Sequence, residues 1–197
     1  MKNKEKTDEC ATQVEYRKYL PSDCDTIRAI FKNEASYHGK NAGKRECVCY
    51  MFLDYYLKYE PDNVIVALDQ GKVCGCIVGS TDVKKFTDKM KTEFLPKVAK
   101  VSKIWALFFR LCIRTNSKLD KCGGYGFHIN IASGHQGKKI GTNLMQKAAE
   151  NASIKGKKFM YLVTAGRKTV GYAFYSKLGF KEAKHMFGGS ILMTFDL

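Results

Sequence analysis

The chain has 197 residues, of which 45% are hydrophobic and 12% aromatic. That apolar content excludes an intrinsically disordered protein and is enough for a folded core. Lys and Arg total 34 against 19 acidic residues, a formal net charge of +15, which favours an anionic ligand: nucleic acid, lipid or a phosphorylated small molecule. Because the basic residues are spread from end to end, we expect them to attract an anionic cofactor and predict no dedicated nucleic-acid site.

The first residues of the chain and its cysteines indicate the cellular compartment to expect. Residues 1–12 are polar and lack the apolar core of a signal peptide, and no run of about 18 apolar residues follows. We therefore expect a disordered tail at 1–12, no transmembrane segment and a cytoplasmic location, where the eight cysteines stay reduced. Cys74 and Cys76 share one face of a predicted strand, too far apart for an unstrained disulfide. No histidine recurs near a cysteine at zinc-site spacing, so no metal site is predicted.

Hydrophobic periodicity predicts the elements of the first half. A strand is expected at 14–20 and a helix from Pro21 to about Glu34. A second helix is predicted over 46–59, with an apolar stripe made of Val48, Met51, Phe52, Tyr55, Tyr56 and Tyr59. Two apolar runs joined by Asp69-Gln70-Gly71 then predict an antiparallel hairpin over 63–68 and 72–80.

Beyond the hairpin lies a segment, about 81–120, that does not fit a compact alternation of strands and helices. The elements predicted after it are a strand at 124–132, a helix at 139–154, a strand at 159–165, a helix at 168–178 and strands at 180–186 and 190–195. Strands linked by helices indicate a parallel pair, and hairpins indicate antiparallel flanks. The predicted fold class is therefore α/β, a mixed sheet of about seven strands with helices on both faces. We expect a single domain over 13–197 with a helical insert at about 81–120.

Two motifs carry the chemistry. In the first, residues 131–145, a strand passes through a glycine-bearing turn into a helix. Gly137 and Gly141 let the backbone approach a diphosphate at the helix N-terminus, and two lysines beside them add charge. Taken alone, the turn could equally be a plain strand-to-helix connection with surface lysines.

In the second motif, residues 173–180, a helix carries Tyr175 and ends at Gly179, where a left-handed residue would close it. A phenol near a helix end can donate a proton to a neighbouring site. Taken alone, Tyr175 could equally be a core tyrosine with a bonded hydroxyl.

Together, and in this order, the motifs resemble the GNAT superfamily of acyl-CoA N-acyltransferases. The family's Gln/Arg-x-x-Gly-x-Gly/Ala is similar to Gln136-Gly-Lys-Lys-Ile-Gly141, and its Ala-x-x-Phe-Tyr-x-Lys-x-Gly-Phe is matched from Phe174 through Phe180. The resemblance covers residues 60–197 and implies a GNAT-like fold and acetyl-CoA as the donor. Three departures stand out: Lys139 replaces the first motif glycine, Lys168 a frequent asparagine and Gly171 an alanine.

The resemblance also implies the roles of residues. The pantetheine arm would lie between the strands 124–132 and 159–165, the pyrophosphate would bind N–H groups of the turn, and Tyr175 would protonate the leaving thiolate. The cofactor-binding residues implied in this way are Ile131, Ala132, Gln136, Gly137, Lys138, Lys139, Ile140, Gly141, Thr142, Lys168 and Tyr175.

A base for the acceptor amine is harder to find. Period two places His128 and Asn130 on one face of the strand 127–131, opposite Phe127, Ile129 and Ile131, and that face could line an acceptor cleft. His128 is a candidate base because its ordinary pKa suits proton removal near neutrality, and Asn130 is a candidate substrate contact. Glu34, Glu46 and bound water are alternatives.

The run Ile104–Ile113 is apolar nearly all round, which indicates burial, a lid over the acceptor site or a subunit contact in a homodimer. Membrane docking is a weaker alternative. The insert and the Phe127-His-Ile-Asn pattern look similar to bacterial GNAT proteins related to the domain found beside O-GlcNAc hydrolases. The predicted function is transfer of an acetyl group from acetyl-CoA to a small-molecule amine or protein amine by direct attack. A non-catalytic acyl-CoA-binding or sensing domain and a binder of anionic surfaces are the alternatives.

Overall fold

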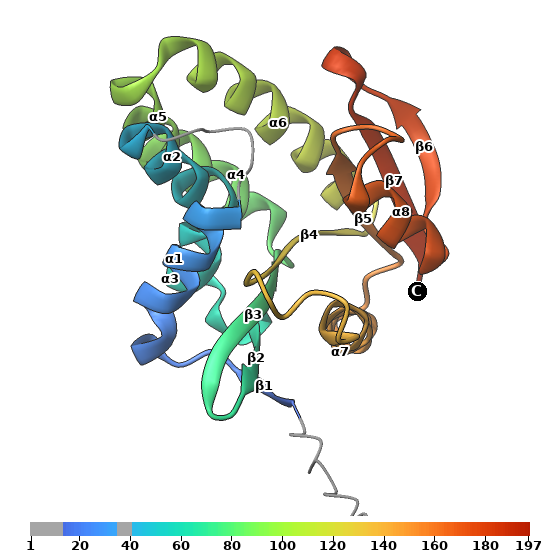
Figure 1. Cartoon of the computed structure of the whole chain (residues 1–197). Coiled ribbons are helices and arrows are strands. Elements are labelled where there is room, and N and C mark those ends of the chain that lie inside the picture. Colours follow the sequence, from blue (N-terminus) through green and yellow to red (C-terminus); the bar gives the residue numbers. More distant parts are fainter. Residues whose placement is uncertain (1–13, 35–40) are drawn as a thin grey trace, which may run out of the picture.

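The computed structural model describes residues 14–34 and 41–197, except the side chains of Glu34, Asp120, Lys121 and Phe187. The tail predicted at 1–12 lies outside the described residues. The strands form one mixed sheet in the order β1-β2-β3-β4-β5-β7-β6 (Figure 1). They are β1 (Glu15–Lys18), β2 (Ile65–Asp69), β3 (Lys72–Gly79), β4 (Gly124–Ile131), β5 (Phe159–Thr164), β6 (Lys181–His185) and β7 (Ile191–Asp196). Neighbouring strands are antiparallel except β4 and β5, which are parallel. The predicted mixed seven-stranded sheet is confirmed.

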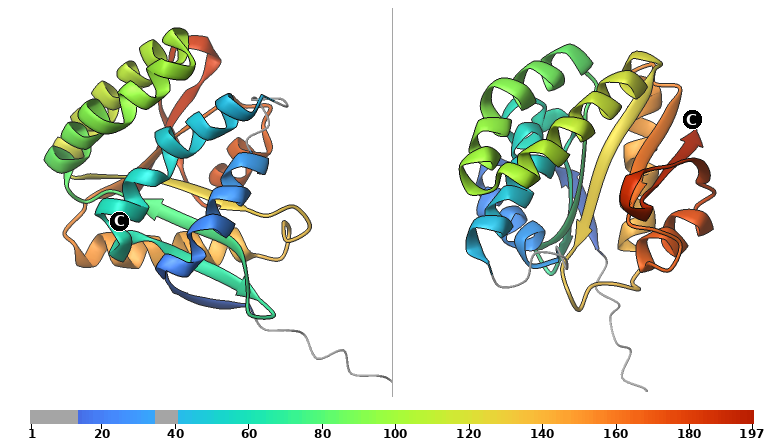
Figure 2. Two further views of the ribbon diagram at one scale, coloured as in Figure 1. Left: turned by 90° about the vertical axis from the view of Figure 1, so that its left-hand side faces the viewer. Right: turned by 90° about the horizontal axis from the view of Figure 1, so that it is seen from above.

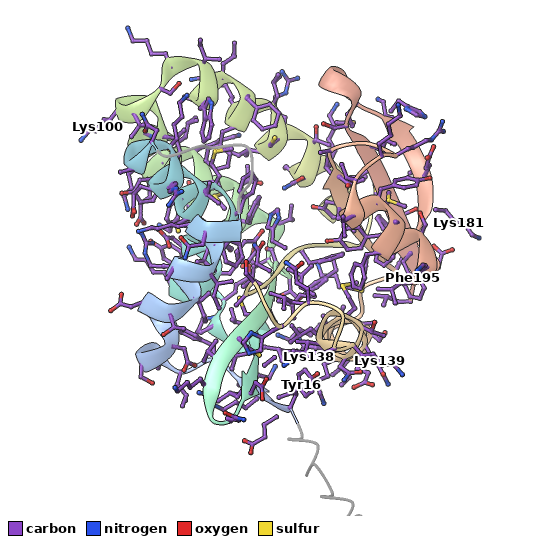
Figure 3. All side chains as sticks on the ribbon, in the orientation of Figure 1. Tyr16, Lys100, Lys138, Lys139, Lys181 and Phe195 are labelled. Carbon is purple, nitrogen blue, oxygen red and sulfur yellow. The ribbon has the colours of Figure 1, made fainter. Side chains whose placement is uncertain are left out.

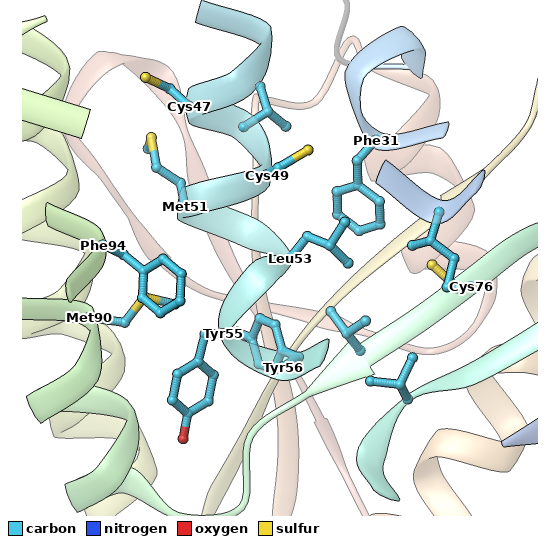
Figure 4. Close-up of a cluster of buried hydrophobic side chains, with 14 of the residues drawn as sticks. Phe31, Cys47, Cys49, Met51, Leu53, Tyr55, Tyr56, Cys76, Met90 and Phe94 are labelled. Carbon is cyan, nitrogen blue, oxygen red and sulfur yellow. The ribbon is translucent and has the colours of Figure 1, made fainter. Parts of the chain in front are cut away.

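Helices cover both faces of this sheet (Figures 1 and 2). One face carries α1 (Cys24–Glu34), α2 (Ala42–Phe52), α3 (Asp54–Tyr59), α4 (Val83–Lys89), α5 (Leu95–Val101) and α6 (Lys103–Lys121). The other carries α7 (Ile140–Ile154) and α8 (Val170–Lys177). Two apolar cores result, because alternate strand residues point to opposite faces. Figure 4 shows the first core, in which Phe31, Leu53 and Phe94 pack with Tyr55 and Tyr56.

The link between β3 and β4 is much longer than the topology requires. These strands are antiparallel neighbours, which a two-residue turn can join. Residues 80–123 instead fold as α4, a turn of π-helix η4 (Met90–Phe94), α5 and α6. Pro96 has no N–H to donate to the preceding turn, which accounts for the irregular ladder there.

Helix α6 buries only part of its apolar surface. Phe109 and Ile113 are buried in the first core, whereas Ile104 is 81% exposed. Burial, one of the three roles considered for this run, thus applies to one side of the helix. The homodimer stays a prediction.

The helix predicted over 46–59 is wrong in one respect, because it is two helices that meet at Leu53. The backbone of Leu53 leaves the helical region, with φ −135° and ψ −59°, and its side chain is fully buried. No glycine or proline marks this break. The helix is interrupted where the side chain of Leu53 packs into the core. The apolar period continues across the bend, so periodicity alone could not reveal it.

The placement expected for Cys74 and Cys76 is also wrong. The register of β2 and β3 shifts between Ala67 and Leu68, which makes Cys74 the extra residue of a β-bulge. Cys74 consequently packs in the second core and Cys76 in the first.

Candidate active site

The site begins where two central strands separate. β4 and β5 are paired at Gly124↔Phe159, Tyr125↔Met160 and Gly126↔Tyr161, and both continue beyond these pairs. On its other edge β4 is paired with β3, and on its other edge β5 is paired with β7. The two strands therefore diverge past Tyr161 and leave a splay between their facing edges (Figure 1).

Backbone groups of β4 face this splay at alternate residues. The N–H of Ala132 donates to the carbonyl of Cys74 over 2.8 Å, and the carbonyl of Gly126 accepts from the N–H of Ser80 over 3.1 Å. Even-numbered residues of β4 thus bond to β3, and the N–H and C=O groups of Phe127, Ile129 and Ile131 point toward the splay. Such an edge can pair with an extended amide-bearing chain. The position expected of Ile131 is compatible with this role, whereas the N–H of Ala132 is already donated.

The turn before α7 supplies further donors. Within the described part of the chain, the N–H groups of Gly137 through Thr142 have no hydrogen-bond partner. Ile140 and Gly141 are buried and Thr142 is exposed, so the first turn of α7 packs against the core on one side and faces solvent on the other. Free N–H groups at the positive end of a helix dipole bind anions such as a diphosphate.

Lys139 takes the backbone conformation for which glycine is favoured. It is the N-cap of α7, with φ 62° and ψ 6°, and Gly137 has φ 81°. A left-handed lysine costs about 1–2 kcal/mol. The turn therefore keeps its backbone shape although lysine stands where the family has glycine. The side chain of Lys139 is exposed to solvent.

The other predicted phosphate contacts differ in their surroundings. The Nζ atom of Lys138 lies 3.2 Å from Oδ2 of Asp69, which also lies 3.3 Å from Nε2 of His135. The ion pair of Lys138 and Asp69 links the turn before α7 to the β2–β3 hairpin. Figure 3 shows Lys138 and the neighbouring Lys139. Gln136 and Lys168 are both exposed, and Lys168 lies one residue before Thr169, the N-cap of α8.

Tyr175 projects from α8 into the splay. Its ring packs against Phe127, Phe174 and Phe180 at centroid distances of 6.1, 5.2 and 5.7 Å. Its hydroxyl makes no hydrogen bond to any residue that the structure describes. Burial raises the pKa of Tyr175, so the phenol keeps its proton at neutral pH.

A cavity of about 660 Å³ lies beside the splay, and its lining includes Phe127 and Ile129 of β4. Its walls are β4, β5, α1, α2 and α6, and Tyr175 of α8 and Ser190 before β7 also line it. His128 and Asn130 face it as well. The structure therefore brings the predicted acid, the predicted base and the predicted substrate contact to one space.

His128 is poorly suited to be a base. Its ring lies against Phe52 and Tyr56, at centroid distances of 5.0 and 5.9 Å. Burial lowers the pKa of His128 to about 4, so the imidazole is neutral at pH 7 and only weakly basic. A general base works best with a pKa near the working pH. The structure thus argues against the proton-removing role expected of His128, although a neutral imidazole can still accept a hydrogen bond.

The structure gives little support to the glutamates considered as alternatives to His128 for the general base. Glu46 forms ion pairs with Arg28 and Lys32, and Arg28 also binds Asp54. These pairs occupy the Glu46 carboxylate. The side chain of Glu34 lies outside the described residues.

For the outer wall of the cavity, the sequence offered only a lid over the acceptor site as one of three roles of the run Ile104–Ile113, and it singled out none of that wall's residues as site residues. Phe31, Phe52, Trp105, Phe108 and Asn116 line it from α1, α2 and α6. The signal was present in the run Ile104–Ile113, where apolar residues lie on two sides of the helix. One side packs on the core and the other borders the cavity.

A parallel strand pair that splays beside a helix N-terminus can hold an extended amide-bearing chain and a diphosphate, which are the two parts of coenzyme A that an acyl-CoA-dependent acyltransferase must bind. The sequence profile of the Acetyltransferase (GNAT) family matches residues 25–180, and the chain belongs to this family of acetyl-CoA-dependent acetyltransferases. No curated protein matches the sequence.

Solved structures share this fold at low sequence identity. A protein described as SsHAT is 20% identical, with a TM-score of 0.78 over 93% of this chain and 98% of that one. PaiA N-acetyltransferase from Thermoplasma acidophilum, in complex with coenzyme A, is 15% identical, with a TM-score of 0.64 over 94% and 99%. Polyamine N-acetyltransferase from Drosophila melanogaster is 15% identical, with a TM-score of 0.66 over 94% and 100%. The finer resemblance to domains beside O-GlcNAc hydrolases receives no support from these comparisons.

Among residues 14–34 and 41–197, no group of three or more His, Cys, Asp or Glu side chains is placed to hold a metal ion. No helix in the same ranges is both long and apolar enough to cross a membrane.

Proposed function

We propose that this chain transfers the acetyl group of acetyl-CoA directly to a primary amine, with both substrates bound together. The observation that carries the proposal is that one cavity is lined by the free edge of β4, by Tyr175 and by the face bearing His128 and Asn130. A donor and an acceptor can meet there without a covalent enzyme intermediate. The solved relatives described as N-acetyltransferases favour an amine as the acceptor.

Acetyl-CoA would be bound both by backbone hydrogen-bonding groups and by positively charged side chains. The unpaired N–H groups of Gly137 through Thr142 would hold the pyrophosphate, and Gln136 would border it. The edges of Ile129 and Ile131 would pair with the amides of the pantetheine arm. Lys138, Lys139 and Lys168 would add positive charge near the phosphates.

Catalysis would rest on position and on one proton donor. The lone pair of the amine attacks the thioester carbonyl carbon, so that a C–N bond forms and the C–S bond breaks. A backbone N–H facing the splay would stabilise the negative charge on the carbonyl oxygen. Tyr175 would give its proton to the departing sulfur, and the proton lost by the nitrogen would restore the phenol, directly or through water.

The cavity itself would help to deprotonate the acceptor. An ammonium group loses hydration on entering an apolar space, which lowers its pKa and favours the neutral amine. Neutral His128 could accept a hydrogen bond from that amine, and Asn130 could orient it. No strong base is then required.

Replacement of Tyr175 by phenylalanine tests the proposal. Acetyl-CoA affinity, measured by calorimetry, should stay close to that of the parent, while kcat should fall about 10²-fold or more. Tyr172→Phe is the matched control, because Tyr172 lies on the same helix but its hydroxyl donates to Glu182 over 2.6 Å. The acetylated amine should be measured by mass spectrometry, since the eight cysteines of the chain react with thiol reagents.

Two results would contradict the proposal. Equal turnover by Tyr175→Phe and Tyr172→Phe would remove Tyr175 from the reaction. Acetyl-CoA binding without turnover on any amine would favour the acyl-CoA-sensing alternative.

A further inference from the structure

The walls of the cavity show which kind of amine fits. Six aromatic residues of α1, α2, α6, β4 and β5 line it: Phe31, Phe52, Trp105, Phe108, Phe127 and Tyr161. Of the lining residues that the structure describes, none is Asp, Glu, Lys or Arg. The polar lining consists of a few neutral groups, among them Asn116, Asn130 and neutral His128.

Such walls disfavour an acceptor with more than one positive charge. A second ammonium or a guanidinium would lose its hydration in the cavity and find no carboxylate among the described lining. Glu46 and Asp54, the acidic residues of the neighbouring helices α2 and α3, are already paired with Arg28. An uncharged aromatic body would instead gain ring contacts with the walls.

Helix α6 gives this preference a structural origin. It belongs to the connection between β3 and β4, which the sheet does not need for its topology. Trp105, Phe108 and Asn116 of α6 face the cavity, and Phe108, 52% exposed, stands at its rim.

We infer that the acceptor is an arylalkylamine, a single primary amine on an uncharged aromatic body, and that α6 selects it. This inference rests on the proposed acetyl transfer and names the acceptor of the same cavity. The amine would lie toward the splay and the aromatic body against the rings of α2 and α6.

Binding can be tested without any turnover. Trp105 is the one tryptophan of the chain, and it lines the cavity, so its fluorescence reports on what enters. In the presence of coenzyme A, 2-phenylethylamine should change this fluorescence in a saturable way, whereas spermidine and agmatine should not at equal concentration. A saturable response to spermidine or agmatine and none to 2-phenylethylamine would overturn the inference.

Turnover with two charge variants tests the role of α6. The parent should show a kcat/KM for 2-phenylethylamine at least about tenfold above that for spermidine or a lysine-containing peptide. Phe108→Glu places a carboxylate at the rim and should reduce this ratio about tenfold or more, mainly through KM. Leu107→Glu is the matched control, because Leu107 is the next residue of α6, is 61% exposed and does not line the cavity. It should keep the parent ratio.

The outcomes separate the inference from the proposed function. If spermidine, agmatine or the peptide is the better substrate, or if both variants change the ratio equally, the inference fails while acetyl transfer stands. If acetyl-CoA does not bind at all, both fail. Binding of acetyl-CoA with no turnover of any amine also overturns both, and far-UV circular dichroism of each variant shows that it is folded.

Discussion

Gly126 and Tyr161 are the last paired residues of the two parallel strands, and their pairing marks where the cavity opens. A Cβ atom on Gly126 would lie 2.5 Å from the hydroxyl oxygen of Tyr161 and 2.6 Å from Cζ. Tyr161 is buried, so its ring has little room to move away. The absence of a side chain at residue 126 is therefore what allows these strands to pair up to the point where they part.

Gly126→Ala should accordingly destabilise the protein. The added methyl group overpacks the pair, which typically costs about 1–3 kcal/mol in the free energy of unfolding. Urea denaturation of the variant and the parent gives the value. In a double-mutant cycle with Tyr161→Ala, the two losses should not add, because the second change removes the obstruction. Full additivity would show that the clash is not the cause.

Gly171→Ala, the same substitution in α8, should have the opposite effect. A Cβ atom at Gly171 meets only Thr164 Oγ1 at 3.6 Å and Tyr175 Cε2 at 3.8 Å, which are ordinary contacts. Gly171 is the second residue of α8, where alanine is favoured over glycine by at most about 0.5–1 kcal/mol, the value for a helix interior. Thermal and urea denaturation should show a gain of up to this size, and a loss would mean that the Tyr175 ring is displaced.

The effect of substituting Lys139 on stability should depend on how well the new residue tolerates the left-handed backbone conformation. Glycine removes the strain of the left-handed residue but adds freedom to the unfolded chain, so Lys139→Gly should change the unfolding free energy by less than about 1 kcal/mol. Lys139→Val, β-branched at φ 62°, should lose about 1–3 kcal/mol. Similar losses in both variants would indicate that the side chain, and not the backbone, matters for stability.

His128 should make stability depend on pH. Its pKa falls from the ordinary value of 6.5 to about 4 in the folded state. Between these values the unfolded chain binds a proton that the folded chain does not, so stability declines as the pH falls from 6.5 to 4, by up to about 3 kcal/mol. In His128→Phe this contribution is absent. Urea denaturation across the window should therefore show the parent losing more stability than the variant, and parallel curves would contradict the lowered pKa.

The same shift predicts the pH profile of activity. Because His128 stays neutral above about pH 4, kcat/KM should rise with the neutral fraction of the amine and show no inflection near 6.5. His128→Gln should keep the shape of the profile even if its height changes. An inflection near 6.5 that disappears in His128→Gln would restore His128 as the base.

Several parts of the fold could be predicted because their signals are local. Asp69-Gln70-Gly71 marked the hairpin, and the glycine turn before α7 marked the helix N-terminus. The bend at Leu53 could not, since no glycine or proline marks it and it depends on packing from distant elements. The bulge at Cys74 has a neighbouring signal in Gly75, because an isolated glycine inside a strand often marks a bulge, but the alternating pattern alone does not reveal it. The same limit holds for the site. The turn at Gln136–Thr142 is a continuous stretch, whereas the cavity wall joins Phe31, Phe52 and Phe108 from separate helices.

The helical connection between β3 and β4 has a consequence for how such a protein can change. Because its two ends are neighbouring strands, the segment 80–123 can be exchanged for another without rethreading the sheet. The turn before α7 and helix α8 pack in the other core, on the far side of the strands. The share of acceptor selectivity that α6 supplies could therefore be exchanged as one segment between Gly79 and Gly124, while the walls from α1 and α2 and the residues proposed to bind the donor stay unchanged.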